Sequence, residues 1–176
     1  SDARGSKGFP NLTDTDWLWG GSFADIQKTI AEGRNGVMPP MAAAVGGGDD
    51  VRNVAQYVLS LSGSPHDSVA AQLGRSKFTA CAACHGVDGK GNPAMGAPNL
   101  TDKVWLHGGS LAAISEQIDK GRTNVMPAHK DFLGPERAKA EARQCAESLF
   151  LTRELFATPR RDAVLILVSQ FEHRVV

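Results

Sequence analysis

The chain has 176 residues, of which 41% are hydrophobic, and its 19 basic residues balance its 19 acidic residues. This length allows one or two small globular domains, and the absence of net charge argues against general nucleic-acid binding. The sequence has no apolar run approaching the roughly 18 residues that cross a bilayer. Three cysteines are too few for a disulfide-rich scaffold.

An internal repeat organises most of the chain. Residues 10–39 and 98–127 align without gaps at an offset of 88 residues, with 18 of 30 positions identical. Such self-similarity indicates two copies of one domain. The copies are assigned to residues 1–63 and 68–134, and the turn-rich segment 64–67 is expected to link them.

Each copy is expected to be helical, so that the chain is predicted to be all-α. Equivalent helices should begin after the N-caps Ser22 and Ser110 and end at Gly33 and Gly121, because serine and glycine favour these helix ends. Further helices are predicted at residues 49–62 and 68–83, and no strand-like alternation is evident. The apolar positions that define these helices are Phe23, Ile26, Ile30, Val51, Val54, Val58, Leu61, Val69, Leu73, Phe78, Leu111, Ile114 and Ile118.

The motif that carries chemistry is the C-x-x-C-H run from Cys81 to His85. This is the attachment signature of a c-type haem. Two thiols one helical turn apart can form thioethers with both vinyl groups of one porphyrin, and His85 can then bind the iron. A zinc site would need about four ligands, and Cys145 is isolated. A thioredoxin-type motif would need a βαβ pattern.

A sixth iron ligand is the next expectation, because a thioether in that position raises the potential of an electron carrier. Met126 lies 41 residues beyond His85 in a Val-Met-Pro sequence, and Met38 occupies the equivalent position in the first copy. A lone methionine usually fills a core, but two at equivalent positions favour a ligand role. Weaker candidates are Met41, Met95 and His129.

The runs C-x-x-C-H, PNLT-x-x-x-WL-x-GG and GR-x-x-VMP together resemble the dihaem subunit III (CcoP-like) of cbb3-type cytochrome c oxidases, over about residues 2–134. The resemblance implies two tandem class I cytochrome c domains at the periplasmic face of the bacterial inner membrane. It also implies partners and a role, namely passing electrons from a donor cytochrome c to the oxygen-reducing subunit of the terminal oxidase in aerobic or microaerobic respiration. The N-terminal membrane anchor normal in this family is absent from the sequence.

Residue roles follow from this resemblance one position at a time. Cys81 and Cys84 become the covalent haem links, His85 the proximal iron ligand, and Met126 and Met38 the distal ligands. Either each methionine serves the haem of its own copy, or the two are crossed, and the sequence leaves both options open. The resemblance implies that the Pro98 carbonyl accepts a hydrogen bond from His85. Trp105 either lines the haem pocket or fills the core, and Arg122 either pairs with a haem propionate or is solvated. Gly74 and Phe78 resemble the contact pair where the first helix of such a domain crosses the last.

The sequence departs from the family at both ends. The first copy lacks C-x-x-C-H, which by alignment would end just before Ser1, so we expect a fragment with one covalent haem site from a protein that binds two haems. Residues 135–176 contain no glycine and do not resemble the end of the first copy. They are interpreted as an atypical tail, frameshifted from about residue 138, with a genuine extension containing a helix at 136–156 as the alternative.

Other functions are considered beside electron transfer. The sequence shows no Ser/His/Asp set, paired carboxylates or phosphate loop, so we expect no catalytic site in this subunit itself. A haem-based gas sensor or a haem peroxidase would also carry the motif, but with an exchangeable or open sixth position on the iron. The histidines outside the motif are interpreted as surface residues, namely His66, His107, His129 and His173.

Overall fold

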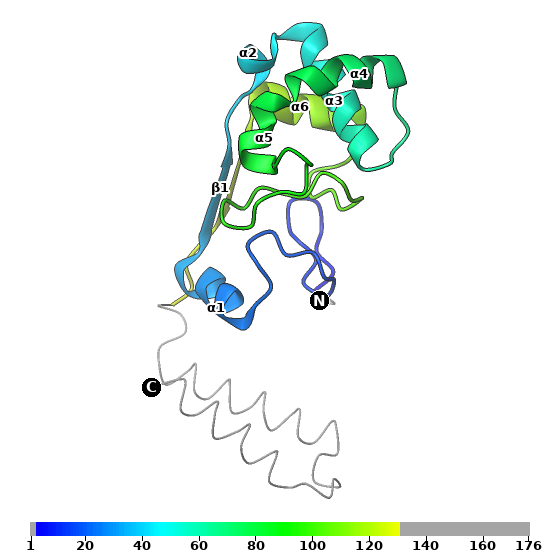
Figure 1. Ribbon diagram of the computed structural model, residues 1–176. Helices are drawn as coiled ribbons and strands as arrows, with labels where there is room; N and C mark the ends of the chain where they lie inside the picture. The colour runs from blue at the N-terminus through cyan, green and yellow to red at the C-terminus, as the bar shows by residue number, and fades with distance from the viewer. Residues whose placement is uncertain (1–2, 131–176) are drawn as a thin grey trace, which may run out of the picture. The chain divides into compact units, whose positions relative to one another are not determined.

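The computed structural model describes residues 3–130, and the predictions for the tail and for Cys145 lie outside this range (Figure 1). Residues up to Pro127 belong to one compact unit. Its elements in chain order are α1 (Phe23–Glu32), β1 (Arg34–Met38), α2 (Ala42–Val45), α3 (Gly48–Leu61), α4 (Ser68–Lys77), α5 (Thr79–His85), α6 (Leu111–Lys120) and β2 (Arg122–Met126).

The predicted ends of the equivalent helices α1 and α6 are confirmed. The side chains of Ser22 and Ser110 each accept a backbone hydrogen bond at 3.2 Å from the third residue of the helix that follows. Gly33 and Gly121 end the helices with φ angles of 72° and 70°. Glycine adopts this left-handed region without the steric cost that a Cβ would bring.

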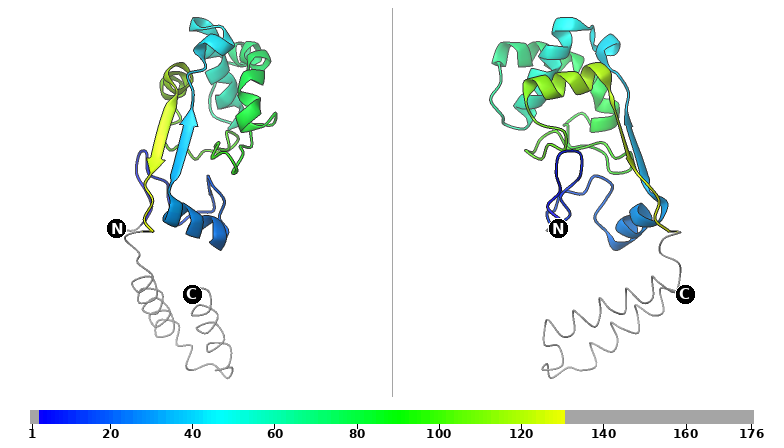
Figure 2. Two further views of the ribbon diagram at one scale, coloured as in Figure 1. Left: turned by 90° about the vertical axis from the view of Figure 1, so that its left-hand side faces the viewer. Right: turned by 180° about the vertical axis from the view of Figure 1, so that it is seen from behind.

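The core is built from helices of both copies. Val51, Val54 and Val58 of α3 are buried, and they belong to one apolar cluster with Ile114 and Ile118 of α6. Helix α3 comes from the first copy but packs on α4 and α6 of the second (Figures 1 and 2). Residues 64–67 therefore join two helices that pack on each other, and the two copies interleave within one unit.

The prediction of a helical chain holds for most of this unit, but β1 and β2 form a two-stranded antiparallel sheet that the all-α prediction did not include (Figure 2). In its register Arg34 lies opposite Met126, and Met38 lies opposite Arg122. The strands are equivalent segments of the two copies, so each finds its partner 88 residues away. A five-residue strand with a central glycine and few apolar residues gives little alternation to detect from one segment alone.

One face of this sheet is turned toward the interior. In β1, Arg34, Gly36 and Met38 are partly buried, whereas Asn35 and Val37 are exposed. Successive strand residues point to opposite faces, which accounts for the alternation. Arg34 and Met38 are four residues apart on β1, as Arg122 and Met126 are on β2. Within each strand, the arginine and the methionine therefore point to the same face of the sheet.

The predicted helix at 68–83 is divided in the structure into α4 and α5, which meet at Phe78. Phe78 is 3% exposed and joins the core, with its ring 5.1 Å from that of Tyr57 in an edge-on contact. Val69 and Leu73 are largely exposed. The buried side of α4 is instead formed by the small residues Ala71 and Gly74, which allow α3 to approach closely.

The equivalent helices α1 and α6 differ in burial. Ile114 and Ile118 of α6 are 4% and 3% exposed, but within the described part of the chain α1 buries none of its residues. Helix α3 covers α6 and provides the apolar contacts that bury these side chains. Among residues 3–130, no helix combines the length and apolar character needed to span a membrane.

Candidate functional site

Helix α5 carries the two cysteines of the C-x-x-C-H motif. Cys81 is buried in the core cluster, Cys84 is partly buried, and both are free thiols. Burial raises the pKa of the Cys81 thiol, and the neighbouring Cys84 adds to the effect. The two thiols lie one helical turn apart, which is the spacing that thioether attachment to one porphyrin requires.

The histidine of the motif ends the same helix. His85 is 8% exposed, and its Nδ1 atom lies 3.0 Å from the carbonyl oxygen of Pro98. Because a carbonyl can only accept, Nδ1 donates, and Nε2 is left with a free lone pair. Burial lowers the pKa of His85, while the hydrogen bond to Pro98 partly opposes this shift. Burial thus favours the neutral ring, which is the form that binds a metal, and the hydrogen bond to Pro98 orients it.

The loop after α5 positions this proline carbonyl. The Gly91 amide donates to the carbonyl of His85 at 2.8 Å, which folds the loop back onto the helix end. A Cβ on Gly91 would lie 2.5 Å from the Ala97 oxygen and 2.7 Å from the carbonyl carbon of Pro98. The chain can therefore bring Pro98 beside His85 only with glycine at this position.

The structure separates the two candidate methionines. Met38 packs against the same core cluster as Cys81 and Trp105. Met126 is 37% exposed and lies opposite Arg34, at the α1 end of the sheet. Met41, a weaker candidate from the sequence, also packs against this cluster. Of Met38 and Met126, only Met38 packs against the core cluster that includes Cys81.

Two further predicted site residues, Trp105 and Arg122, belong to the second copy. The Trp105 ring is pressed against Gly109, where a Cβ would approach its Cδ1 atom to 2.5 Å. Arg122 lies opposite Met38, and its Nε atom is buried without a hydrogen-bond partner in the described structure. His107, interpreted from the sequence as a surface residue, is partly buried, and its Nε2 atom likewise has no partner there. One signal in the sequence pointed to the burial of His107. In the repeat, His107 is equivalent to Trp19, an aromatic residue next to Gly20.

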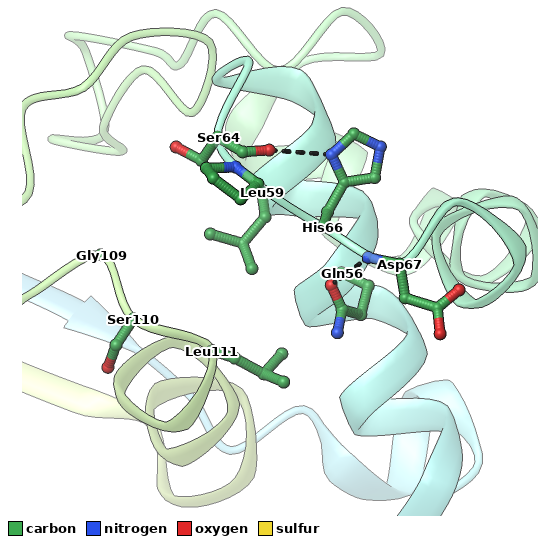
Figure 3. Close-up of a pocket in the computed structure, with 9 residues that line it drawn as sticks. Gln56, Leu59, Ser64, His66, Asp67, Gly109, Ser110 and Leu111 are labelled. Carbon is green, nitrogen blue, oxygen red and sulfur yellow. Dashed lines mark hydrogen bonds between the residues drawn. The ribbon is translucent and has the colours of Figure 1, made fainter.

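An open pocket of about 470 Å³ lies elsewhere, where the turn after α3 faces the start of α6 (Figure 3). Its hydrogen bonds are local: His66 Nδ1 lies 2.8 Å from the Ser64 oxygen, and the Asp67 amide donates to Gln56 at 3.0 Å. The pocket contains none of the predicted haem residues. Within residues 3–130, no group of three or more His, Cys, Asp or Glu side chains is arranged to hold a metal ion.

The site combines two free cysteines one turn apart with a buried histidine that follows at once and is oriented by a proline carbonyl. These features define the site of a c-type cytochrome. Comparison with known proteins agrees with this class. Residues 70–142 match the family model described as cytochrome c oxidase, cbb3-type, subunit III.

The chain is also similar to curated subunits of such oxidases. It is 64% identical over 137 residues to the cbb3-type cytochrome c oxidase subunit CcoP of Rubrivivax gelatinosus, covering 78% of this chain and 45% of the relative. It is 49% identical over 146 residues to subunit FixP of Azorhizobium caulinodans, covering 77% and 50%. The chain spans about half the length of these relatives. Over more than three quarters of its own length the chain is thus similar to CcoP and FixP subunits of cbb3-type oxidases.

Proposed function

We propose that this protein transfers electrons through a haem c bound covalently by Cys81 and Cys84, with His85 as the proximal iron ligand. The observation that carries the proposal is the buried His85 ring, oriented by Pro98 directly beside the two free thiols. When bound, the haem iron supplies one-electron redox chemistry. The protein holds the imidazole neutral and excludes water from it, since His85 is almost fully buried.

The proposed partners are a donor cytochrome c and the oxygen-reducing subunit of a cbb3-type oxidase, at the periplasmic face of the inner membrane. Similarity to CcoP and FixP subunits supports this assignment. The proposal extends to two haems in the longer protein, of which the chain described here would attach one through its single C-x-x-C-H motif.

We further propose that Met38, rather than Met126, is the distal ligand at the haem held by His85. The position of Met38 against the cluster that contains Cys81 supports this crossed arrangement. So does the antiparallel register, which puts Met126 and Met38 at opposite ends of the sheet. By the symmetry of the repeat, Met126 would then serve a haem belonging to the first copy.

Haem counting and gas binding test the electron-transfer assignment. A pyridine-haemochrome assay on the chain matured with haem c should give one covalent haem, and C81A/C84A should give none. The reduced spectrum should not change with carbon monoxide, because a methionine occupies the sixth position. A five-coordinate spectrum that shifts with carbon monoxide would instead favour a gas sensor or a peroxidase. A chain without covalent haem would contradict the proposal.

A further inference from the structure

The open pocket between the turn after α3 and the start of α6 lies apart from the proposed haem residues (Figure 3). Its volume of about 470 Å³ is large enough for a small molecule, and Leu59, Pro65 and Leu111 give it apolar walls. Two groups that can donate hydrogen bonds also line it, namely the first turn of α6 and the side-chain amide of Gln56. Apolar walls with a few polar groups are typical of ligand sites.

The first turn of α6 has backbone donors that remain unused within the described residues. Ser110 caps the helix by accepting a hydrogen bond from the Ala113 amide at 3.2 Å. The amides of Leu111 and Ala112 have no acceptor among residues 3–130. The first amides of a helix lack intrahelical acceptors and point out of its N-terminus. Together with the helix dipole, they favour a negatively charged group at this end.

The equivalent helix of the first copy supplies such a group itself. Asp25, in the first turn of α1, accepts a hydrogen bond from the Ser22 hydroxyl at 2.5 Å. Its carboxylate lies against Gly20, where a Cβ would fall 2.5 Å from Oδ2. At the equivalent position α6 has Ala113, and its first turn contains no acidic residue. The helix start that opens on the pocket is therefore the one without a carboxylate of its own.

Gln56 provides a second, independent donor. It is 8% exposed, and its Oε1 atom accepts a hydrogen bond from the Asp67 amide at 3.0 Å. Because a backbone N–H can only donate, the oxygen of the side-chain amide must face Asp67, which turns Nε2 toward the pocket (Figure 3). Nε2 has no acceptor within the described residues. Buried donors are normally paired, so a ligand that accepts hydrogen bonds is indicated.

The charged residues that line the pocket are compatible with an anion. The carboxylate of Asp67 already accepts hydrogen bonds from the Val69 and Ala70 amides, at the start of α4. Figure 3 shows it pointing away from the start of α6. His66 donates from Nδ1 to the Ser64 carbonyl oxygen at 2.8 Å and offers a positive charge when it is protonated. The acidic side chain of the pocket is thus engaged at another helix, and the donors around Gln56 are left for a ligand.

We propose that this pocket binds a carboxylate carried on a short aliphatic arm. The carboxylate accepts hydrogen bonds from the Leu111 amide and from Nε2 of Gln56, and it does for α6 what the Asp25 carboxylate does for α1. The aliphatic arm packs on Leu59 and Pro65. A free short-chain carboxylate and a glutamate side chain of a partner protein share this chemistry. The pocket contains none of the predicted haem residues, so the inference does not depend on the proposed function.

The test is an NMR titration of the chain matured with haem c, in its reduced form. Butyrate should give saturable shifts of the Leu111 and Ala112 backbone amides and of the Gln56 side-chain amide. Butyramide, which has a similar shape but no charge, should bind at least about tenfold more weakly, because hydrogen bonds to a charged acceptor are the stronger ones. A blocked pentapeptide with one central glutamate distinguishes the two sources. Tighter binding than butyrate indicates a partner protein, and weaker binding indicates a free carboxylate.

Variants connect these shifts to the proposed donors. A113D gives α6 the acidic residue that α1 has, so its own carboxylate should occupy the site and abolish the butyrate shifts. Q56E keeps the oxygen that accepts from the Asp67 amide but puts a negative charge where Nε2 was, and it should also abolish binding. D25A is the matched control in the first copy. It removes the carboxylate at the start of α1 and should leave butyrate binding unchanged.

Three results would overturn the site. They are a wild type whose Leu111 and Gln56 amides respond to neither butyrate nor the peptide, shifts that chloride reproduces at the same concentration, and shifts that persist unchanged in A113D. If Q56E folds poorly, A113D still decides, because an acidic residue in the first turn of a helix is stabilising. Haem content and the visible spectrum of the same samples report on the electron carrier, so a failure of one proposal is distinguishable from a failure of the other.

Discussion

Gly74 of α4 lies directly against the backbone of Asn53 in α3. A Cβ built on Gly74 would fall 2.0 Å from the Asn53 carbonyl oxygen and 2.7 Å from the Val54 amide nitrogen. This contact joins the closing helix of the first copy to the opening helix of the second. The helix that leads into the C-x-x-C-H segment is thus packed against a helix that the repeat assigns to the other copy.

Replacing Gly74 with alanine is expected to destabilise the fold. Alanine is favoured over glycine in a helix by about 1 kcal/mol, but here its methyl group would overlap backbone atoms that no side-chain rotation can move. Overpacking of this kind costs about 1–3 kcal/mol or more, so the overlap decides the sign. Denaturant unfolding should show a net loss of stability. Q72A, on the exposed side of the same helix, should be neutral or slightly stabilising, and a G74A protein as stable as Q72A would contradict the close crossing.

The two methionines of the repeat offer a matched pair of variants. M38L in the haem-loaded chain should remove the thioether ligand, lower the midpoint potential and allow carbon monoxide to bind, because a thioether raises the potential of haem iron. M126L should leave the spectrum and potential of the His85-bound haem unchanged. Leucine preserves volume and apolarity, so packing should change little in either variant.

The converse result would overturn the crossed arrangement. If M126L opened the iron to carbon monoxide and M38L did not, each methionine would serve its own copy. M41L provides a third comparison, since Met41 also packs against the core cluster. If M41L alone altered the spectrum, the distal ligand would be Met41, at the start of α2.

Local rules were sufficient to predict most helices. The N-caps Ser22 and Ser110 and the apolar positions of α3 depend on neighbours within one turn, and the structure confirms them. The strands were missed because β1 and β2 pair at long range, and each five-residue segment by itself carries little periodic signal. The long-range packing of α3 on α4 was also beyond a local pattern, because each copy could have closed on itself.

The candidate site was likewise predicted from the sequence only in part. Cys81, Cys84 and His85 lie within five consecutive residues of one helix, so their spacing alone indicated their chemistry. The distal ligand at the haem held by His85 is either the methionine of its own copy or that of the other copy. Both methionines stand in identical Val-Met-Pro sequences, so the sequence cannot distinguish these alternatives. His107 was read as a surface residue because nothing in its neighbours shows that Gly8 and Arg122 approach it. Its burial depends on the contact between copies.

Equivalent N-caps should have unequal effects on stability. S110A and S22A each remove a 3.2 Å cap hydrogen bond, a loss typically worth about 0.5–2 kcal/mol. Helix α6 buries Ile114 and Ile118, whereas α1 buries none of its residues in the described structure. S110A should therefore lower the global unfolding free energy, and S22A should mainly speed local hydrogen exchange in α1. Equal global losses in both variants would show that α1 contributes to the cooperative core.

A carboxylate cluster predicts a pH-dependent gain in stability. Burial raises the pKa of Asp16, and the carboxylates of Asp102 and Asp14 raise it further. Since the folded state then holds the proton more tightly than the unfolded state, Asp16 contributes stability at low pH that is lost as pH rises through its folded pKa. D16N should thus be more stable than the wild type at pH 7, by less than about 1 kcal/mol because the group is exposed and screened. The gain should vanish below about pH 3, where the carboxyl is protonated in both states, and should shrink in high salt. Thermal melts across pH would measure it, and a stability difference independent of pH and salt would contradict the electrostatic origin.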